Sequence, residues 1–272
     1  MSSDTILQPV LEHGWRSGLV NLLRKENSLW WRTRKWWIQT LVWLVISNGI
    51  VAFLLWVVPV IDPSAGGRIS LSAVNELLKV FLQLELFFTT FGVMVLSQGL
   101  VVNEKKFGTA AWVFSNPVSR SSYIFSKLIG HGWAIFVILV LGQCLLAYLQ
   151  FTLKAGMLFN PIPLILAIGV MCLYLLFYLT LALMLGTLFD STGPVIGIPI
   201  GVLIGMVLIP QILGNLFPWL VLILPGRLTD LVVAVGAGLS LPANWHYPLI
   251  STGILIVVFI TSAIARLKRE EF

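Results

Sequence analysis

The sequence predicts an all-α polytopic membrane protein with six transmembrane helices, and three observations lead to this fold class. Of the 272 residues, 58% are hydrophobic and only 10% are charged, where soluble domains average roughly 45–50% and about 25%. The mean hydropathy is +0.97. The apolar residues form long uninterrupted runs, whereas the strands of outer-membrane barrels alternate apolar and polar residues. This composition excludes a soluble globular domain, and it also excludes a disordered chain, which needs low hydrophobicity and high net charge.

Six apolar runs reach the length of roughly 20 residues that a helix needs to cross a bilayer. They cover residues 38–61, 80–102, 128–153, 161–189, 194–213 and 247–265. A further apolar stretch, 228–241, is too short for a span and is interrupted by Asp230 and two glycines. We expect it to form an outer re-entrant or interfacial helix within 214–245, before the last span.

The positions of the basic residues predict the orientation of the chain. Most of the 17 lysines and arginines fall in the amino-terminal segment, in the second connection and in the tail, and the positive-inside rule places these segments in the cytoplasm. We expect a cytoplasmic segment at 1–37, a six-span domain at 38–265 with a cytoplasmic loop at 103–127, and a cytoplasmic tail at 266–272. Both termini would then be cytoplasmic, in the plasma (inner) membrane of a prokaryote. The net charge of +6 follows from this bias and indicates contact with the lipid bilayer rather than with nucleic acid.

Residues 15–30 have the pattern of an amphipathic helix that lies along the cytoplasmic headgroups. At 100° per residue the apolar side chains form one arc, made by Trp15, Leu19, Leu22, Leu23, Leu29 and Trp30. Glu26 falls in the middle of this arc, where an unpaired carboxylate would be costly. We expect Glu26 to pair with Lys105, Lys106 or Arg120; the alternative is that the helix is rotated and Glu26 reaches water.

Motifs for catalysis and for nucleotide or metal binding are missing from the sequence. It has no G-x-x-x-x-G-K-[ST], no H-E-x-x-H and no G-x-S-x-G. Its three histidines lie far apart, and its two cysteines lie inside apolar runs. We therefore expect no enzyme activity, no catalytic residue, and no cofactor or metal on this chain.

The second connection combines charges at its start with aromatic residues in its middle. It contains Glu104-Lys105-Lys106-Phe107-Gly108-Thr109, later Ser115-Asn116-Pro117-Val118-Ser119-Arg120, and then Lys127. We expect a short helix over 104–115 that Pro117 ends, and a cap by Ser119 on the following helix. We expect Arg120 and Lys127 at the headgroup layer. Exposed Phe107, Trp112 and Phe114 would form a docking surface; the alternative is an interfacial loop with belt aromatics.

This segment resembles the first cytoplasmic loop of the permease subunits of ABC exporters, in the ABC-2 membrane family. The family pattern has acidic and basic residues before Gly-Thr, then Ser/Thr-x-Pro-Val/Ile-Ser/Thr-Arg and a lysine, although leucines are usual where Ala111-Trp112 stand. The resemblance implies a homo- or heterodimer of permeases and a separate nucleotide-binding ATPase subunit that carries ATP and Mg. It assigns ATPase coupling to Glu104, Lys105, Phe107, Gly108, Thr109, Trp112, Phe114, Pro117 and Arg120.

Two spans carry further candidate sites. The fifth span has four glycines spaced by four, which would let another helix approach closely: Gly193, Gly197, Gly201 and Gly205. The second span is the most polar, and polar groups within a bilayer face protein or a water-filled path. Its pathway candidates are Gln83, Glu85, Thr89 and Thr90, and we expect Glu85 to face the interior.

The function that we predict is that of a membrane-spanning permease subunit of an ABC exporter. It would form half of the translocation pathway and would be driven by a separate ATPase subunit. Two alternatives remain open at this point: a stand-alone channel or secondary transporter, and a membrane assembly or immunity subunit that transports nothing.

Overall fold

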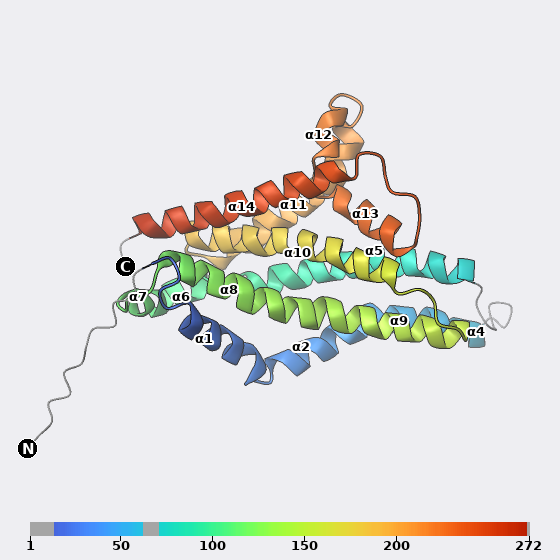
Figure 1. Ribbon diagram of the computed structural model, residues 1–272, viewed down its shortest axis with the longest axis horizontal. Coiled ribbons are helices and arrows are strands. Elements are labelled where there is room, and N and C mark those ends of the chain that lie inside the picture. Colours follow the sequence, from blue (N-terminus) through green and yellow to red (C-terminus); the bar gives the residue numbers. More distant parts are fainter. Residues whose placement is uncertain (1–13, 62–70, 271–272) are drawn as a thin grey trace, which may run out of the picture.

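The computed structural model describes residues 14–61 and 71–270, and these form an all-helical bundle without strands (Figure 1). Six helices are long and apolar enough to cross a membrane, so the predicted fold class is confirmed. They cover Lys35–Ile61, Ala73–Lys106, Arg120–Ala155, Ile162–Leu188, Thr192–Leu213 and His246–Arg269. The prediction from run length succeeds because lipid offers no hydrogen-bond partners. The backbone N–H and C=O groups of a long apolar run must therefore bond to one another, as they do in a helix.

The first and third spans are built from several helical pieces. The first contains α2 (Lys35–Trp43), η1 (Leu44–Asn48), α3 (Gly49–Ala52), η2 (Phe53–Val57) and α4 (Val58–Ile61). The third contains α8 (Arg120–Ile135), η4 (Phe136–Leu141) and α9 (Gly142–Ala155). The η segments are π-helical turns, which are rare and occur frequently at functional sites.

The remaining helices follow in chain order. They are α1 (Leu19–Trp31), α5 (Leu71–Ser97), α6 (Val102–Lys106), α7 (Thr109–Phe114), α10 (Ile162–Leu188), α11 (Thr192–Leu213), α12 (Pro218–Leu222), α13 (Arg227–Gly236) and α14 (His246–Arg269). Figure 1 shows α1, α6, α7 and the carboxyl end of α14 together at one end of the bundle, which we call the α6–α7 end. The end of α4 lies at the opposite end.

The core is centred on α10, which packs against α5, α13 and α14. The helix α10 carries apolar residues on all of its faces, which is typical of a core helix or of a membrane span. In the stretch 228–241, only residues 228–236 are helical; they belong to α13, whose ten residues are too few to cross a bilayer. Gly236 permits its close packing, because a Cβ atom there would lie 2.3 Å from Leu82 Cδ1 and 3.1 Å from Ala167 Cβ.

Candidate functional site

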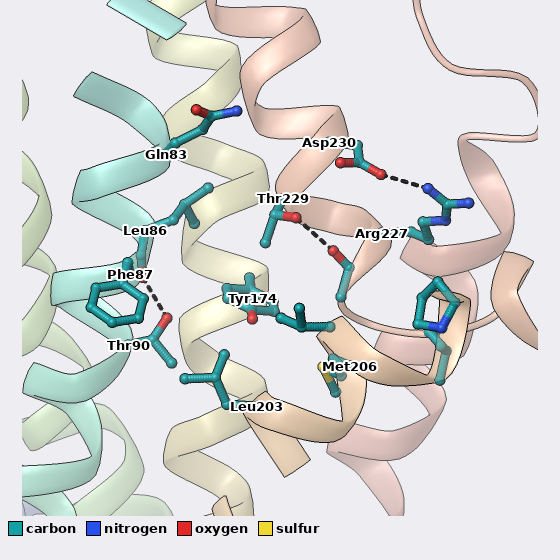
Figure 2. Close-up of a pocket in the computed structure, with 14 residues that line it drawn as sticks. Gln83, Leu86, Phe87, Thr90, Tyr174, Leu203, Met206, Arg227, Thr229 and Asp230 are labelled. Carbon is teal, nitrogen blue, oxygen red and sulfur yellow. Dashed lines mark hydrogen bonds and ion pairs between the residues drawn. The ribbon is translucent and has the colours of Figure 1, made fainter. Parts of the chain in front are cut away.

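A cavity of about 360 Å³ lies between α5, α10, α11 and α13 (Figure 2). Two of the pathway candidates on α5, Gln83 and Thr90, line it. Its walls also include Tyr174 of α10 and Met206 of α11. A mostly apolar cavity with a few polar groups is typical of a small-molecule site, and this volume falls at the lower end of the usual range of about 300–1,000 Å³.

The polar residues of α13 add a charged pair to this cavity. Arg227 Nη1 donates to Asp230 Oδ2 over 2.8 Å, and both side chains are about half exposed. Thr229 Oγ1 donates to the carbonyl oxygen of Gly226, as Figure 2 shows. Sequence reasoning did not find these residues, because only the folded chain brings α13 beside α5 and α10.

The other two pathway candidates point elsewhere. Glu85 is fully buried, which confirms its predicted interior position, but it does not line the cavity. Thr89 is buried and donates its hydroxyl hydrogen to the carbonyl oxygen of Glu85 over 2.6 Å. Thr90 likewise donates to the carbonyl oxygen of Leu86. Within the described chain, α5 thus presents Gln83 and Thr90 to the cavity and keeps Glu85 and Thr89 in the interior.

The α6–α7 segment at the end of the bundle is a pair of short helices. The prediction of one helix over 104–115 was wrong, because Gly108 adopts a positive φ of 68° and separates α6 from α7. This conformation is easy for glycine and strained for most other residues. Thr109 begins α7, and Pro117 follows its end.

The aromatic residues of this segment divide into two groups. Phe107 is 81% exposed and Trp112 is 69% exposed, as a docking surface requires. Phe114 is not part of that surface, contrary to the prediction. Its ring lies 5.0 Å from the ring of Tyr123, and the guanidinium carbon of Arg120 lies 3.7 Å from its centroid. Arg120 and Phe114 therefore join α7 to α8.

Glu104 is the centre of a partly buried cluster of charged side chains. Its Oε1 lies 2.7 Å from Lys25 Nζ of α1 and 3.0 Å from Lys127 Nζ of α8. Tyr123 donates its hydroxyl hydrogen to Glu104 Oε2 over 2.7 Å. Lys127 Nζ also lies 3.1 Å from Glu26 Oε1. The prediction that Glu26 is paired is thus confirmed, but its partner is Lys127 rather than Lys105, Lys106 or Arg120.

The neighbouring residue, Lys105, links the segment to two other parts of the bundle. Its Nζ lies 2.7 Å from Asp190 Oδ1, between α10 and α11, and 2.8 Å from Glu270 Oε1, after α14. The hydrogen bond and charge of Lys105 hold the pKa of Asp190 below its ordinary value. Two adjacent residues of α6 thus contact α1, α8, the α10–α11 turn and the residue that follows α14.

Matching faces of α1 and α8 explain why Glu26 and Lys127 meet. Residues spaced by four lie on one face of a helix. In α1 that face carries the buried residues Leu22, Glu26 and Trp30; in α8 it carries Tyr123, Lys127 and His131. Lys127 is therefore buried between α1 and α8. The same spacing in the sequence could have identified Lys127 as the partner.

The contact with α8 also changes the predicted role of the amphipathic helix. The centre of its apolar face packs against protein, so this part is not available to headgroups. The helix begins at Leu19 rather than at residue 15, because Gly18 has a φ of 74°. Trp15 precedes it, and its carbonyl oxygen accepts hydrogen bonds from Ser119 and Ser122. Leu19 and Leu23 are half-buried beside the central face.

Hydrogen bonds also fix the connection from α7 to α8. The Ser17 hydroxyl group donates to the carbonyl oxygen of Pro117. Ser119 Oγ accepts from the backbone N–H of Ser122 over 3.0 Å, so the predicted cap on the third span is confirmed. The connection is thus held between the start of α1 and the start of α8.

The glycine stripe of α11 does not form a close helix contact within the chain. No described atom lies within 4 Å of a Cβ built on Gly193, Gly197 or Gly201, and Gly205 would meet only Ile209 of its own helix. Most of α11 is at the periphery, where Val195 and Pro199 are its buried residues. The glycines therefore line an open face of the described bundle.

Comparison with known proteins gives a family and no curated relative. No curated protein matches the sequence. Residues 36–272, which include all six spans except Lys35, match the family described as "Protein of unknown function (DUF2705)". The match covers most of the chain, and the protein therefore belongs to this family.

Proposed function

We propose that the protein is the permease subunit of an ABC exporter of the ABC-2 type. In this role it forms half of a translocation pathway and is driven by a separate nucleotide-binding ATPase subunit, which carries ATP and Mg. A second permease subunit, identical or different, completes the pathway. The support comes from the loop motif at 103–127, from the six spans, and from the contacts of the α6–α7 segment.

One observation carries the proposal: the α6–α7 segment is exposed on one side and rigidly connected on the other. Phe107 and Trp112 are the exposed side chains, and large aromatic residues are typical anchors in protein interfaces. Glu104 and Lys105 connect the segment to four parts of the bundle. A displacement applied at Trp112 would therefore reach α1, α8, α10 and α14 together.

The same proposal fixes the orientation. The α6–α7 end carries most of the basic residues, so it faces the cytoplasm of a prokaryotic cell, with both ends of the chain on that side. The cavity of Figure 2 then lies between the helices of the spanning region, where Gln83, Thr90 and Tyr174 add polar groups to those of α13. It is the candidate contact site for a transported molecule.

The test is co-purification with the ATPase subunit. Trp112→Ala and Phe107→Ala should release the ATPase or reduce the stimulation of its ATP hydrolysis by the permease by a factor of ten or more, since interface anchors contribute about 2 kcal/mol or more. Trp219→Ala is the matched control, because Trp219 of α12 is also exposed (61%) but lies outside the segment. Wild-type ATPase binding and stimulation by both loop variants would reject the docking role.

A second experiment separates this function from the alternatives. Permease and ATPase are reconstituted together in vesicles, and substrate movement is measured with ATP and with a non-hydrolysable analogue. Movement that requires hydrolysis supports the exporter. Movement without the ATPase would identify a channel or secondary transporter, and co-purification without movement would identify an assembly subunit.

A further inference from the structure

Among the residues that the structure describes, one acidic side chain is enclosed within the spanning bundle without a counter-charge. Glu85 of α5 is 0% exposed. In the described chain, no lysine, arginine or histidine forms an ion pair with it, and neither carboxyl oxygen makes a hydrogen bond of ordinary geometry. The Ser47 hydroxyl of η1 is the neighbouring polar group; it is also buried, and its oxygen likewise makes no hydrogen bond of ordinary geometry. An ionised carboxylate here would have lost its hydration without compensation.

The other polar groups near Ser47 are already bonded to one another. Asn48 Nδ2 donates to Gln143 Oε1 over 2.9 Å, and Gln150 Nε2 donates to Asn48 Oδ1 over 3.1 Å. Gln143 Nε2 donates to the carbonyl oxygen of Ile138 in the π-helical η4. This network ties the first span to the third. Asn48 and Gln143 therefore each use both their carboxamide oxygen and their carboxamide nitrogen in hydrogen bonds within the protein.

The ionisable groups around α5 leave the carboxyl of Glu85 isolated. Two of the helices that pack against α5 carry a cysteine, Cys144 on α9 and Cys172 on α10. Neither thiol can supply a positive charge. The sequences of η1, η4 and α11, which also pack against α5, contain no ionisable side chain. The remaining ionisable groups of α9, α10 and α13 have other partners: Tyr148, Lys154, Tyr174, Tyr178, Arg227 and Asp230.

From this geometry we propose that Glu85 and Ser47 form a proton-binding site within the membrane-spanning bundle. The ligand is a single proton. It is bound to the Glu85 carboxyl group at neutral pH and is donated in a hydrogen bond to Ser47 Oγ. Binding neutralises the carboxylate and allows α5 to pack against η1; release leaves a charge that needs water or a cation. The site is independent of the proposed function, because it does not involve the α6–α7 segment.

Infrared spectroscopy of the purified full-length protein tests the site directly. A protonated carboxylic acid has a carbonyl stretching band that an ionised carboxylate lacks, and the band shifts when the proton is replaced by deuterium. The wild-type protein should show this band at pH 7, and Glu85→Gln should lose it. Glu76→Gln is the matched control on the same helix: Glu76 is 71% exposed and paired with Lys79, so its removal should leave the band unchanged.

A second variant keeps the acid and removes its partner. Ser47→Ala should retain the band at pH 7 and shift it to higher frequency, because the carboxylic acid loses its hydrogen-bond acceptor. This result does not depend on whether Glu85→Gln folds. Three outcomes would overturn the proposal: no band at pH 7 in the wild type, an unchanged band in Ser47→Ala, or loss of the band when sodium or potassium is added at constant pH, which would identify a cation site instead.

Discussion

Lys127 Nζ lies 3.1 Å from Glu26 Oε1, and both side chains are only 2% exposed. The pair joins α1 to α8, two helices that are far apart in the sequence. Glu104 extends it to α6 through its own contact with Lys127, at 3.0 Å. The α1, α6 and α8 helices therefore share one buried set of charges, and each charge in it depends on the others for compensation.

Removal of one partner of this pair should be strongly destabilising. Lys127→Met leaves Glu26 buried without its cation, which costs about 3–5 kcal/mol in comparable sites. The double variant Glu26→Leu/Lys127→Met should recover part of this loss. Thermal unfolding in detergent measures both. The control is Lys79→Met, which breaks a pair whose Glu76 side chain is 71% exposed and should change stability little. A Lys127→Met unfolding temperature equal to that of Lys79→Met would show that the buried pair is unimportant.

Gly130 should be intolerant of any side chain. A Cβ atom there would lie 2.8 Å from Glu26 Cβ, so alanine must push α1 away from α8. Overpacking of this kind costs about 1–3 kcal/mol. Gly132→Ala is the control two residues along the same helix, because its Cβ would meet Leu179 Cδ2 at an ordinary 3.7 Å. We expect Gly130→Ala to unfold at a lower temperature than Gly132→Ala; the reverse order would contradict the close packing of α1 on α8.

The two kinds of glycine in the spans should respond differently to a large side chain. Gly201→Leu should leave the unfolding temperature of the isolated chain unchanged, because no described atom lies within 4 Å of its Cβ position. Gly236→Leu should destabilise the chain, because Leu82 Cδ1 lies 2.3 Å from the Cβ position. Size-exclusion chromatography of Gly201→Leu then tests separately whether the open face of α11 is needed for assembly. Equal destabilisation by both substitutions would show that α11 is packed within the chain.

Substitution of Phe114 should lower the stability of the chain, whereas substitution of Trp112 should affect only the docking of the ATPase. Phe114→Ala removes ring contacts with Tyr123 and Arg120, which contribute about 1 kcal/mol or more. Trp112→Ala removes a side chain that is 69% exposed and should leave the unfolding temperature unchanged. Unfolding curves of the two variants without the ATPase provide the measurement. A marked loss of stability in Trp112→Ala would mean that this residue packs against the bundle.

Local sequence patterns were enough to predict much of the fold. Features that depend on tertiary contacts between distant segments could not be predicted in the same way. The spans and the Ser119 cap follow from run length and from residues close in sequence. The cost of a buried charge correctly indicated that Glu26 is paired. The partner was missed because Lys127 was assigned to the headgroup layer by its position in the chain, although its spacing from Tyr123 and His131 places it on the buried face of α8.

The candidate functional residues could be predicted from the sequence only where their exposure depends on one short segment of the chain. Exposure of Phe107 and Trp112 follows from their place in a short polar connection. The break at Gly108 turns Phe114 toward α8, and a pattern of aromatic residues alone does not show this. The cavity needs α13 to lie beside α5 and α10, and the buried contact of Ser47 with Glu85 needs the first span to meet the second.

The separation of Glu26 and Lys127 along the chain sets an order for biosynthesis. The two residues are 101 positions apart, and at about 5–20 residues per second the ribosome needs on the order of 5–20 s to pass from one to the other. During that interval the first two spans are made while Glu26 still lacks its cation and must remain hydrated. The amino-terminal helix, although translated first, can therefore take its final position only after the third span has been synthesised.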